Sequence, residues 1–211
     1  MTANHDDGPK PGTLALDAAD FRHRLDFLRA QATAIRRWTV ALSGAAEVGH
    51  VGTALSSVDL LTGLYFHQLR VNPLLSDWAE RDRFILAHAP LAAALYATLG
   101  ARGFLRSDAL WARVKAGHAP AGRTLAAAPG VDLCTGSLGY GLAVGAGLAL
   151  SAQRHGVDWR TIVMLSDADC GDSTAWNPAR AAAHLKLDNL IAIVSTHAPR
   201  ATKGDGSTRS V

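Results

Sequence analysis

Acidic residues follow directly on a short apolar segment in the last quarter of this sequence. Residues 162–165 read Ile-Val-Met-Leu, and residues 166–172 read Ser-Asp-Ala-Asp-Cys-Gly-Asp. After a helical segment rich in alanine, a second apolar run covers residues 190–194. Open α/β sheets bind ligands just beyond the carboxyl ends of their strands, and oxygen ligands suit Mg²⁺ or Ca²⁺. The pattern therefore predicts a ligand or metal site here, although an acidic surface loop between strand and helix explains the same residues equally well.

The composition is that of a globular chain. It has 211 residues, of which 48% are hydrophobic and 18% charged, enough to bury a sizeable core. The net charge is only +3, with no block of Lys or Arg, so we expect no nucleic-acid partner. No apolar run reaches the roughly 18 residues that cross a bilayer, so we expect no membrane partner. The polar N-terminus lacks a signal-peptide core, and two cysteines, Cys134 and Cys170, give no disulfide framework. These features predict a cytoplasmic location.

Alternating helical and strand patterns predict the domain organisation. Short apolar strands over 84–86, 162–165 and 190–194 alternate with helices, which indicates an α/β fold, a mostly parallel sheet with helices on both faces. The last two strands should be parallel neighbours, because one helical crossover joins them. We expect a flexible N-terminal arm at residues 1–19, one domain at residues 20–197 and a loose polar tail at residues 198–211.

Capping and turn residues predict where the helices begin and end. Ser57 is a candidate N-cap, and Pro90 fits the first turn of a helix that ends at Gly103. Residues 117–135 are irregular, and a loop of that length in a compact domain is often functional. The helix of small residues that runs to Leu150 is expected to be deeply buried, since its Gly and Ala residues let other backbones approach closely.

Residues able to do chemistry converge on one edge of the predicted sheet. His50 lies in a Gly-His-Val-Gly turn, and His88 follows a strand. Residues 136–141 form a glycine-rich turn at a helix start, which can present amides to an anion. Asp167 ends a strand. If the strands around it are parallel, Asp167 and His197 lie at the same edge.

In this order, the motifs resemble those of the N-terminal, diphosphate-binding half of the transketolase family, from about residue 20 to about residue 197. The segment from Ser43 to Leu61 resembles the family's S-G-H-x-G motif with the L-S-x-x-D that follows it. Residues 81–89 resemble R-D-R-F-V-L-S-K-G-H-A, and Gly117-His118 resembles G-H-P. Residues 135–141 match T-G-S-L-G-Q-G, and residues 184–191 match H-x-L-x-N-L-I. The resemblance implies the three-layer thiamine-diphosphate-binding fold.

The resemblance also implies a cofactor and a set of site residues. Thiamine diphosphate would be bound together with magnesium, and the cofactor-binding residues would be Gly136, Ser137, Leu138, Gly139, Ser166, Asp167 and Ala168. The metal ligands would be Asp167 and His197. The catalytic residues would be His50, His88 and His118, which would bind substrate hydroxyls and move protons, a role that suits imidazole because it titrates near neutral pH.

This sequence departs from the family pattern at the metal turn. Both glycines of the family's turn are replaced, by Ser166 and Ala168, and the family's metal-binding Asn is His197. Magnesium prefers oxygen to imidazole ligands. An independent divalent-metal site built from Asp167, Asp169, Asp172 and His197 is an alternative, but we expect Asp169 and Asp172 to be solvated surface acids.

The resemblance implies a partner as well. In the family, a second, pyrimidine-binding domain supplies the Glu that activates the cofactor, and this sequence resembles the smaller subunit of a split transketolase. We therefore expect an enzyme subunit that transfers a two-carbon ketol or acyl unit between a small-molecule donor and acceptor. Its partner would be a second subunit carrying the pyrimidine-binding and C-terminal domains. The alternative is a non-catalytic pseudo-transketolase subunit that stabilises or regulates a catalytic partner.

Overall fold

The computed structural model describes residues 18–45, 50–115, 129–134, 140–171 and 173–196. The predicted N-terminal arm, except for its last two residues, and the predicted C-terminal tail lie outside these ranges. The first helix begins at Ala18, two residues before the predicted start of the domain at residue 20. Within the described part of the chain, no helix is both long and apolar enough to cross a bilayer.

Four parallel strands form the central sheet. Their order is β2-β1-β3-β4, and the strands are β1 (Arg83–Leu86), β2 (Leu133–Cys134), β3 (Thr161–Ser166) and β4 (Leu190–Ser195). All six residues of β3 are buried, as expected for a strand covered on both faces. The pairing of β3 with β4 confirms the parallel neighbours predicted from the two apolar runs. β2 was not predicted, because two residues give no recognisable pattern.

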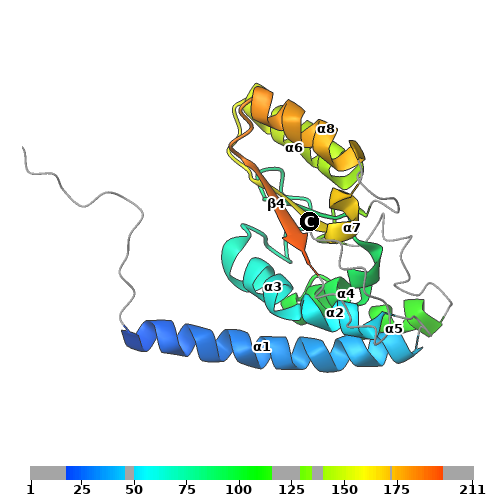
Figure 1. Ribbon diagram of the computed structural model, residues 1–211. Coiled ribbons are helices and arrows are strands. Elements are labelled where there is room, and N and C mark those ends of the chain that lie inside the picture. The colour runs from blue at the N-terminus through cyan, green and yellow to red at the C-terminus, as the bar shows by residue number, and fades with distance from the viewer. Residues whose placement is uncertain (1–17, 46–49, 116–128, 135–139, 172, 197–211) are drawn as a thin grey trace, which may run out of the picture.

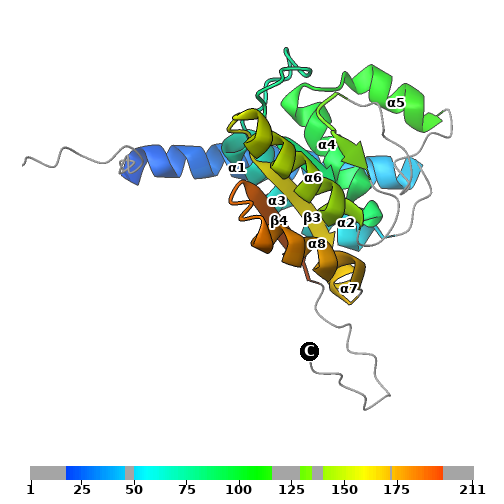
Figure 2. The ribbon, with the colours of Figure 1, turned by 90° about the horizontal axis from the view of Figure 1, so that it is seen from above.

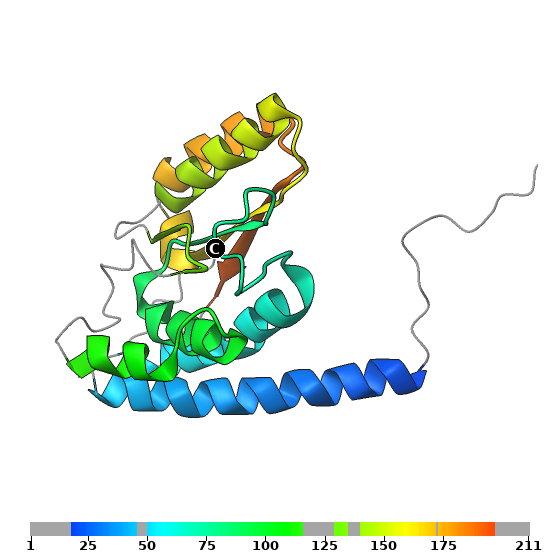
Figure 3. The ribbon, with the colours of Figure 1, turned by 180° about the vertical axis from the view of Figure 1, so that it is seen from behind.

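Helices cover both faces of the sheet and make a three-layer α/β structure (Figures 1 and 3). α6 (Tyr140–His155) and α8 (Ser173–His184) pack together on one face. Below the other face, Figure 1 shows the long helix α1, whose N-terminal end projects beyond the body, as the view from above makes clear (Figure 2). The elements on this side are α1 (Ala18–Ala45), α2 (Val51–Ser56), α3 (Val58–Gly63), the π-helical η1 (Leu64–Gln68), the 3₁₀-helical η2 (Ala89–Leu91), α4 (Ala92–Arg102) and α5 (Ser107–Lys115).

The two helical layers bury different side chains of the sheet. On the α1–α4 side, Phe84 and Met164 join a cluster that includes Ile35 of α1 and Leu95 of α4. On the α6 side, Val163 packs with other apolar residues against Leu142 and its neighbours. α6 lies very close to the sheet there.

Two details of the helices differ from the sequence predictions. Ser57 precedes α3, but its hydroxyl donates to the carbonyl of Ala54 (2.8 Å) and does not cap the helix. α6 is not buried all round: Leu142 and Ala149 face the core, whereas Tyr140 is 59% exposed. By contrast, Gly103 ends α4 with φ +94°, the left-handed conformation that favours glycine, as predicted.

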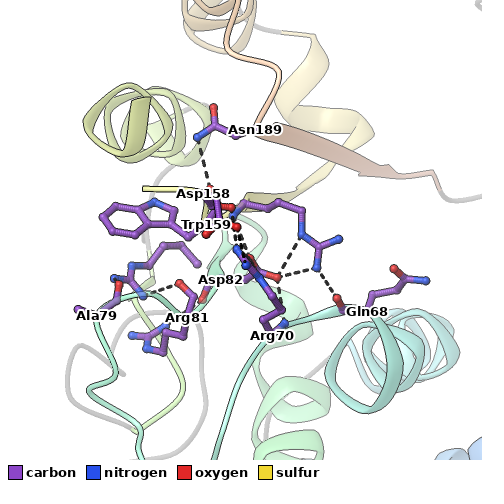
Figure 4. A network of polar contacts seen from close by, with 10 residues as sticks. Gln68, Arg70, Ala79, Arg81, Asp82, Asp158, Trp159 and Asn189 are labelled. Carbon is purple, nitrogen blue, oxygen red and sulfur yellow. Dashed lines mark hydrogen bonds and ion pairs between the residues drawn. The ribbon is translucent and has the colours of Figure 1, made fainter. Parts of the chain in front are cut away.

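A buried carboxylate joins the amino ends of the two central strands (Figure 4). Asp82, which precedes β1, is fully buried and accepts hydrogen bonds from the side chains of Arg70 and Arg160, at 3.3 and 2.6 Å at their closest. It also accepts from the backbone N–H groups of both arginines, at 2.9 Å each. Arg160 in turn donates to the carbonyl of Gln68. This network fixes the edge of the sheet opposite to the one where the predicted site residues gather.

Candidate functional site

The acidic turn lies at the carboxyl end of β3, as predicted. Ser166 is the last residue of β3 and is fully buried, with an extended backbone at φ −102° and ψ 166°. Asp167 is the first residue of the short helix α7 (Asp167–Cys170), and its side chain is exposed. The chain therefore turns at the rim of the sheet and presents one carboxylate outward.

A capping box closes this turn. The N–H and the hydroxyl of Ser166 both donate to Oδ2 of Asp169, at 2.8 and 2.7 Å, and the N–H of Asp169 donates to the Ser166 hydroxyl oxygen at 3.3 Å. Asp169 is fully buried. The prediction that Asp169 is a solvated surface acid is therefore wrong, because these hydrogen bonds satisfy its carboxylate inside the protein. Asp172 lies outside the described residues.

The turn uses most of its own backbone donors. Besides the N–H groups of Ser166 and Asp169, the N–H of Ala168 donates to Oδ1 of Asp167 at 3.0 Å. Three of the four amides of residues 166–169 are therefore engaged within the turn. Backbone N–H groups at a helix start are the usual donors to an anion. Because most of those in this turn are already hydrogen-bonded within it, the turn is a poorer anion site than a helix start normally is.

Negative charge dominates the turn. Burial raises the pKa of the Cys170 thiol above its ordinary value, and the charges of Asp169 and Asp167 raise it further. The Trp176 indole N–H donates to the Cys170 carbonyl at 2.7 Å and ties α8 to the turn. A cation is favoured over a bare anion next to these two carboxylates.

His88 lies at the same rim as Asp167. Leu86, the last residue of β1, pairs with Met164 of β3, and the Ala87 N–H donates to the Met164 carbonyl at 2.9 Å. β3 continues for two more residues to Ser166, so His88 follows the end of β1 on the side of the sheet where Asp167 follows β3. His88 is half-buried, and its carbonyl accepts from the Leu91 N–H at the start of η2 (3.1 Å).

His50 lies on an element next to His88. It precedes α2 with a left-handed φ of 69°, it is exposed, and its carbonyl accepts from the Ala54 N–H at 3.0 Å. α2 packs against η2, which begins directly after His88. The structure thus brings His50, His88 and Asp167 to one side of the molecule.

The other predicted site residues lie outside the described residues: His118, the glycine turn Gly136, Ser137, Leu138 and Gly139, and His197. Within the described ranges, no group of three or more His, Cys, Asp or Glu side chains is placed to hold a metal ion. An exposed carboxylate at the rim nevertheless fits a hard cation, which takes oxygen ligands. The described residues of the site therefore offer one exposed oxygen ligand at this rim, Asp167.

The fold defines a class of protein: a parallel α/β domain, a class whose members bind ligands at the carboxyl rim of the sheet. Residues 28–198 match the family model described as transketolase, thiamine diphosphate binding domain. Because this match covers most of the sequence, the chain belongs to the transketolase family.

Individual relatives agree with this assignment. The chain is 34% identical over 171 residues to a subunit of the apulose-4-phosphate transketolase of Phocaeicola vulgatus, covering 81% of this chain and 61% of that protein. It is 37% identical to the protein of the same name from Actinobacillus succinogenes, covering 80% and 62%. The solved transketolase of Leishmania mexicana superposes with a TM-score of 0.65 at 26% identity, covering 81% of this chain and 27% of that one. The chain thus spans about three fifths of the length of the two apulose-4-phosphate transketolase relatives.

Proposed function

We propose that this chain is the diphosphate-binding subunit of a two-component, transketolase-like enzyme. With a second subunit carrying the pyrimidine-binding and C-terminal domains, it transfers a two-carbon ketol or acyl unit from a small-molecule donor to an acceptor. Two relatives are named as single subunits of a transketolase, which supports the division between two chains. The observation that carries the proposal is the exposed Asp167 carboxylate directly after β3, inside the matched domain.

Each site residue has a role in this proposal. Asp167 is an oxygen ligand of magnesium, with His197 as a second ligand. Ser166 and Ala168, together with the glycine turn at 136–139, flank the diphosphate. Thiamine diphosphate, when bound, supplies the carbanion chemistry, and the protein supplies binding and orientation.

The histidines act on the substrates. His50, His88 and His118 hold donor and acceptor hydroxyl groups and carry protons to and from them, because an imidazole both donates and accepts near pH 7. A cytoplasmic location, as the composition predicts, suits such a reaction.

Metal binding tests the proposal directly, with Mn²⁺ as the probe in place of Mg²⁺. Free Mn²⁺ is followed by electron paramagnetic resonance while the full chain is titrated with and without thiamine diphosphate. The proposal predicts one Mn²⁺ site that depends on thiamine diphosphate and is lost in Asp167→Ala. Asp108→Ala is the matched control, because Asp108 is also an exposed carboxylate in the first turn of a helix that accepts from the next N–H, at 2.9 Å. Equal binding by both variants contradicts the role of Asp167.

A second candidate function is a non-catalytic subunit that stabilises or regulates a catalytic partner. The observation that favours it is the capping box between Ser166 and Asp169, since its hydrogen bonds occupy backbone N–H groups that a diphosphate would otherwise use. This candidate predicts that the chain shows no Mn²⁺ binding that depends on thiamine diphosphate, yet raises the melting temperature of its partner.

A further inference from the structure

We propose that Ser166 and Asp169 are positioning residues that hold the Asp167 carboxylate at the rim of the sheet before any ligand binds. The inference rests on the proposed function and concerns how this particular turn, with Ser and Ala where the family has glycines, can still present a metal ligand.

The hydrogen bonds of the box fix the backbone on both sides of Asp167. Ser166 lies on its N-terminal side, in the last register position of β3 opposite Ser195. Asp169 lies two residues after it, and its Oδ2 accepts two hydrogen bonds from Ser166 at 2.8 and 2.7 Å. Both residues are fully buried, so these bonds are shielded from water. Asp167 is held between two anchored neighbours.

Preorganisation of this kind affects metal binding through entropy. A ligand on a flexible turn loses backbone and side-chain freedom when it binds a metal, whereas a ligand on a turn that is already ordered loses mainly side-chain freedom. In the family pattern, glycines, which have no side chain, flank this aspartate. Here the residue before it is Ser166, whose hydroxyl donates a hydrogen bond to Asp169. Substitution of residues that orient metal ligands typically lowers metal affinity by about 10–100-fold.

The test compares Mn²⁺ affinity, in the presence of thiamine diphosphate, among variants of the full chain. We expect Ser166→Ala to weaken Mn²⁺ binding by about tenfold. Ser166→Thr keeps the hydroxyl and should restore the affinity to within about twofold, since Thr is also a good N-cap. Asp169→Asn keeps the volume and one acceptor oxygen but removes the charge, and should also weaken binding. Asp108→Ala, far from the turn in sequence, should change nothing.

A second readout separates positioning from a general loss of stability. Amide hydrogen exchange of residues 166–170 in the ligand-free chain should accelerate in Ser166→Ala and return to the wild-type rate in Ser166→Thr. A merely structural role would lower the melting temperature without changing Mn²⁺ affinity measured well below it. If wild type binds Mn²⁺ through Asp167 but Ser166→Ala and Asp169→Asn bind it equally well, this inference is wrong while the proposed function stands. If wild type shows no binding that depends on thiamine diphosphate, the proposed function itself fails, and this inference fails with it.

Discussion

Arg160 donates two side-chain hydrogen bonds, of 2.6 and 3.2 Å, to the fully buried carboxylate of Asp82. The two residues are far apart in the sequence, yet they join the starts of β1 and β3. Asp82 also accepts from Arg70 (Figure 4). This one carboxylate therefore connects the amino ends of β1 and β3.

Replacing this carboxylate should destabilise the protein strongly. Asp82→Ala leaves Arg70 and Arg160 without their shared partner, and we expect a loss of about 3 kcal/mol in the free energy of unfolding, measured in urea. Asp158→Ala is the matched control, because Asp158 pairs with the same Arg70 at 3.0 Å but its side chain is 84% exposed. That change should cost less than about 1 kcal/mol. Equal effects of the two substitutions would show that burial of Asp82 contributes nothing.

The same carboxylate predicts how stability depends on pH. Burial raises the pKa of Asp82, but the hydrogen bonds from Arg160 and from backbone N–H groups outweigh it, so the folded pKa is below the ordinary value of 3.8. A lowered folded pKa means that the stabilisation is fully present above the ordinary pKa and is lost as the pH falls through the folded one. Below about pH 4, wild type should therefore lose stability more steeply than Asp82→Asn in urea unfolding.

Two glycines of α6 should respond in opposite directions to alanine. A Cβ at Gly145 would lie 2.3 Å from Cγ2 of Val163, so Gly145→Ala should destabilise the protein by about 1–3 kcal/mol. Gly147 is on the same helix and has nothing within 4 Å of the corresponding point. Gly147→Ala should therefore stabilise by up to about 1 kcal/mol, through helix propensity. Thermal unfolding of both variants measures the difference, and a stabilising Gly145→Ala would contradict the close packing of α6 on β3.

β4 should promote self-association. It is an edge strand among the described elements, all six of its residues are uncharged, and Val194 is 42% exposed. Unprotected edges of this kind pair with other chains. Val194→Lys should lower the aggregation rate in light scattering. Leu74→Lys introduces the same charge at an apolar residue that is 88% exposed and outside the sheet, and it should leave the rate unchanged.

The sequence predicted those parts of the fold that local patterns encode. The strands β1, β3 and β4 are apolar runs, Gly103 supplies a left-handed helix end, and Asp167 lies at the rim because it directly follows β3. β2 was missed because it has only two residues.

Other features depend on contacts that a linear pattern does not contain. The buried carboxylate of Asp82 is satisfied by Arg70 and Arg160, which reach it from other segments, and its sequence neighbours do not indicate this. The capping box could be predicted from the sequence, because Ser166 and Asp169 have the Ser-x-x-Asp spacing of a capping box at a helix N-terminus. An interpretation of the acidic residues as metal ligands or solvated acids does not account for this cap.

Binding of thiamine diphosphate to the full chain tests the central claim most directly. Isothermal titration with thiamine diphosphate should give saturable heat in the presence of Mg²⁺ and none in the presence of EDTA. The heat should disappear in Asp167→Ala and persist in Asp108→Ala. Heat that is independent of Mg²⁺, or that is unchanged in Asp167→Ala, would contradict the assignment of Asp167 as the metal ligand of a diphosphate-binding subunit.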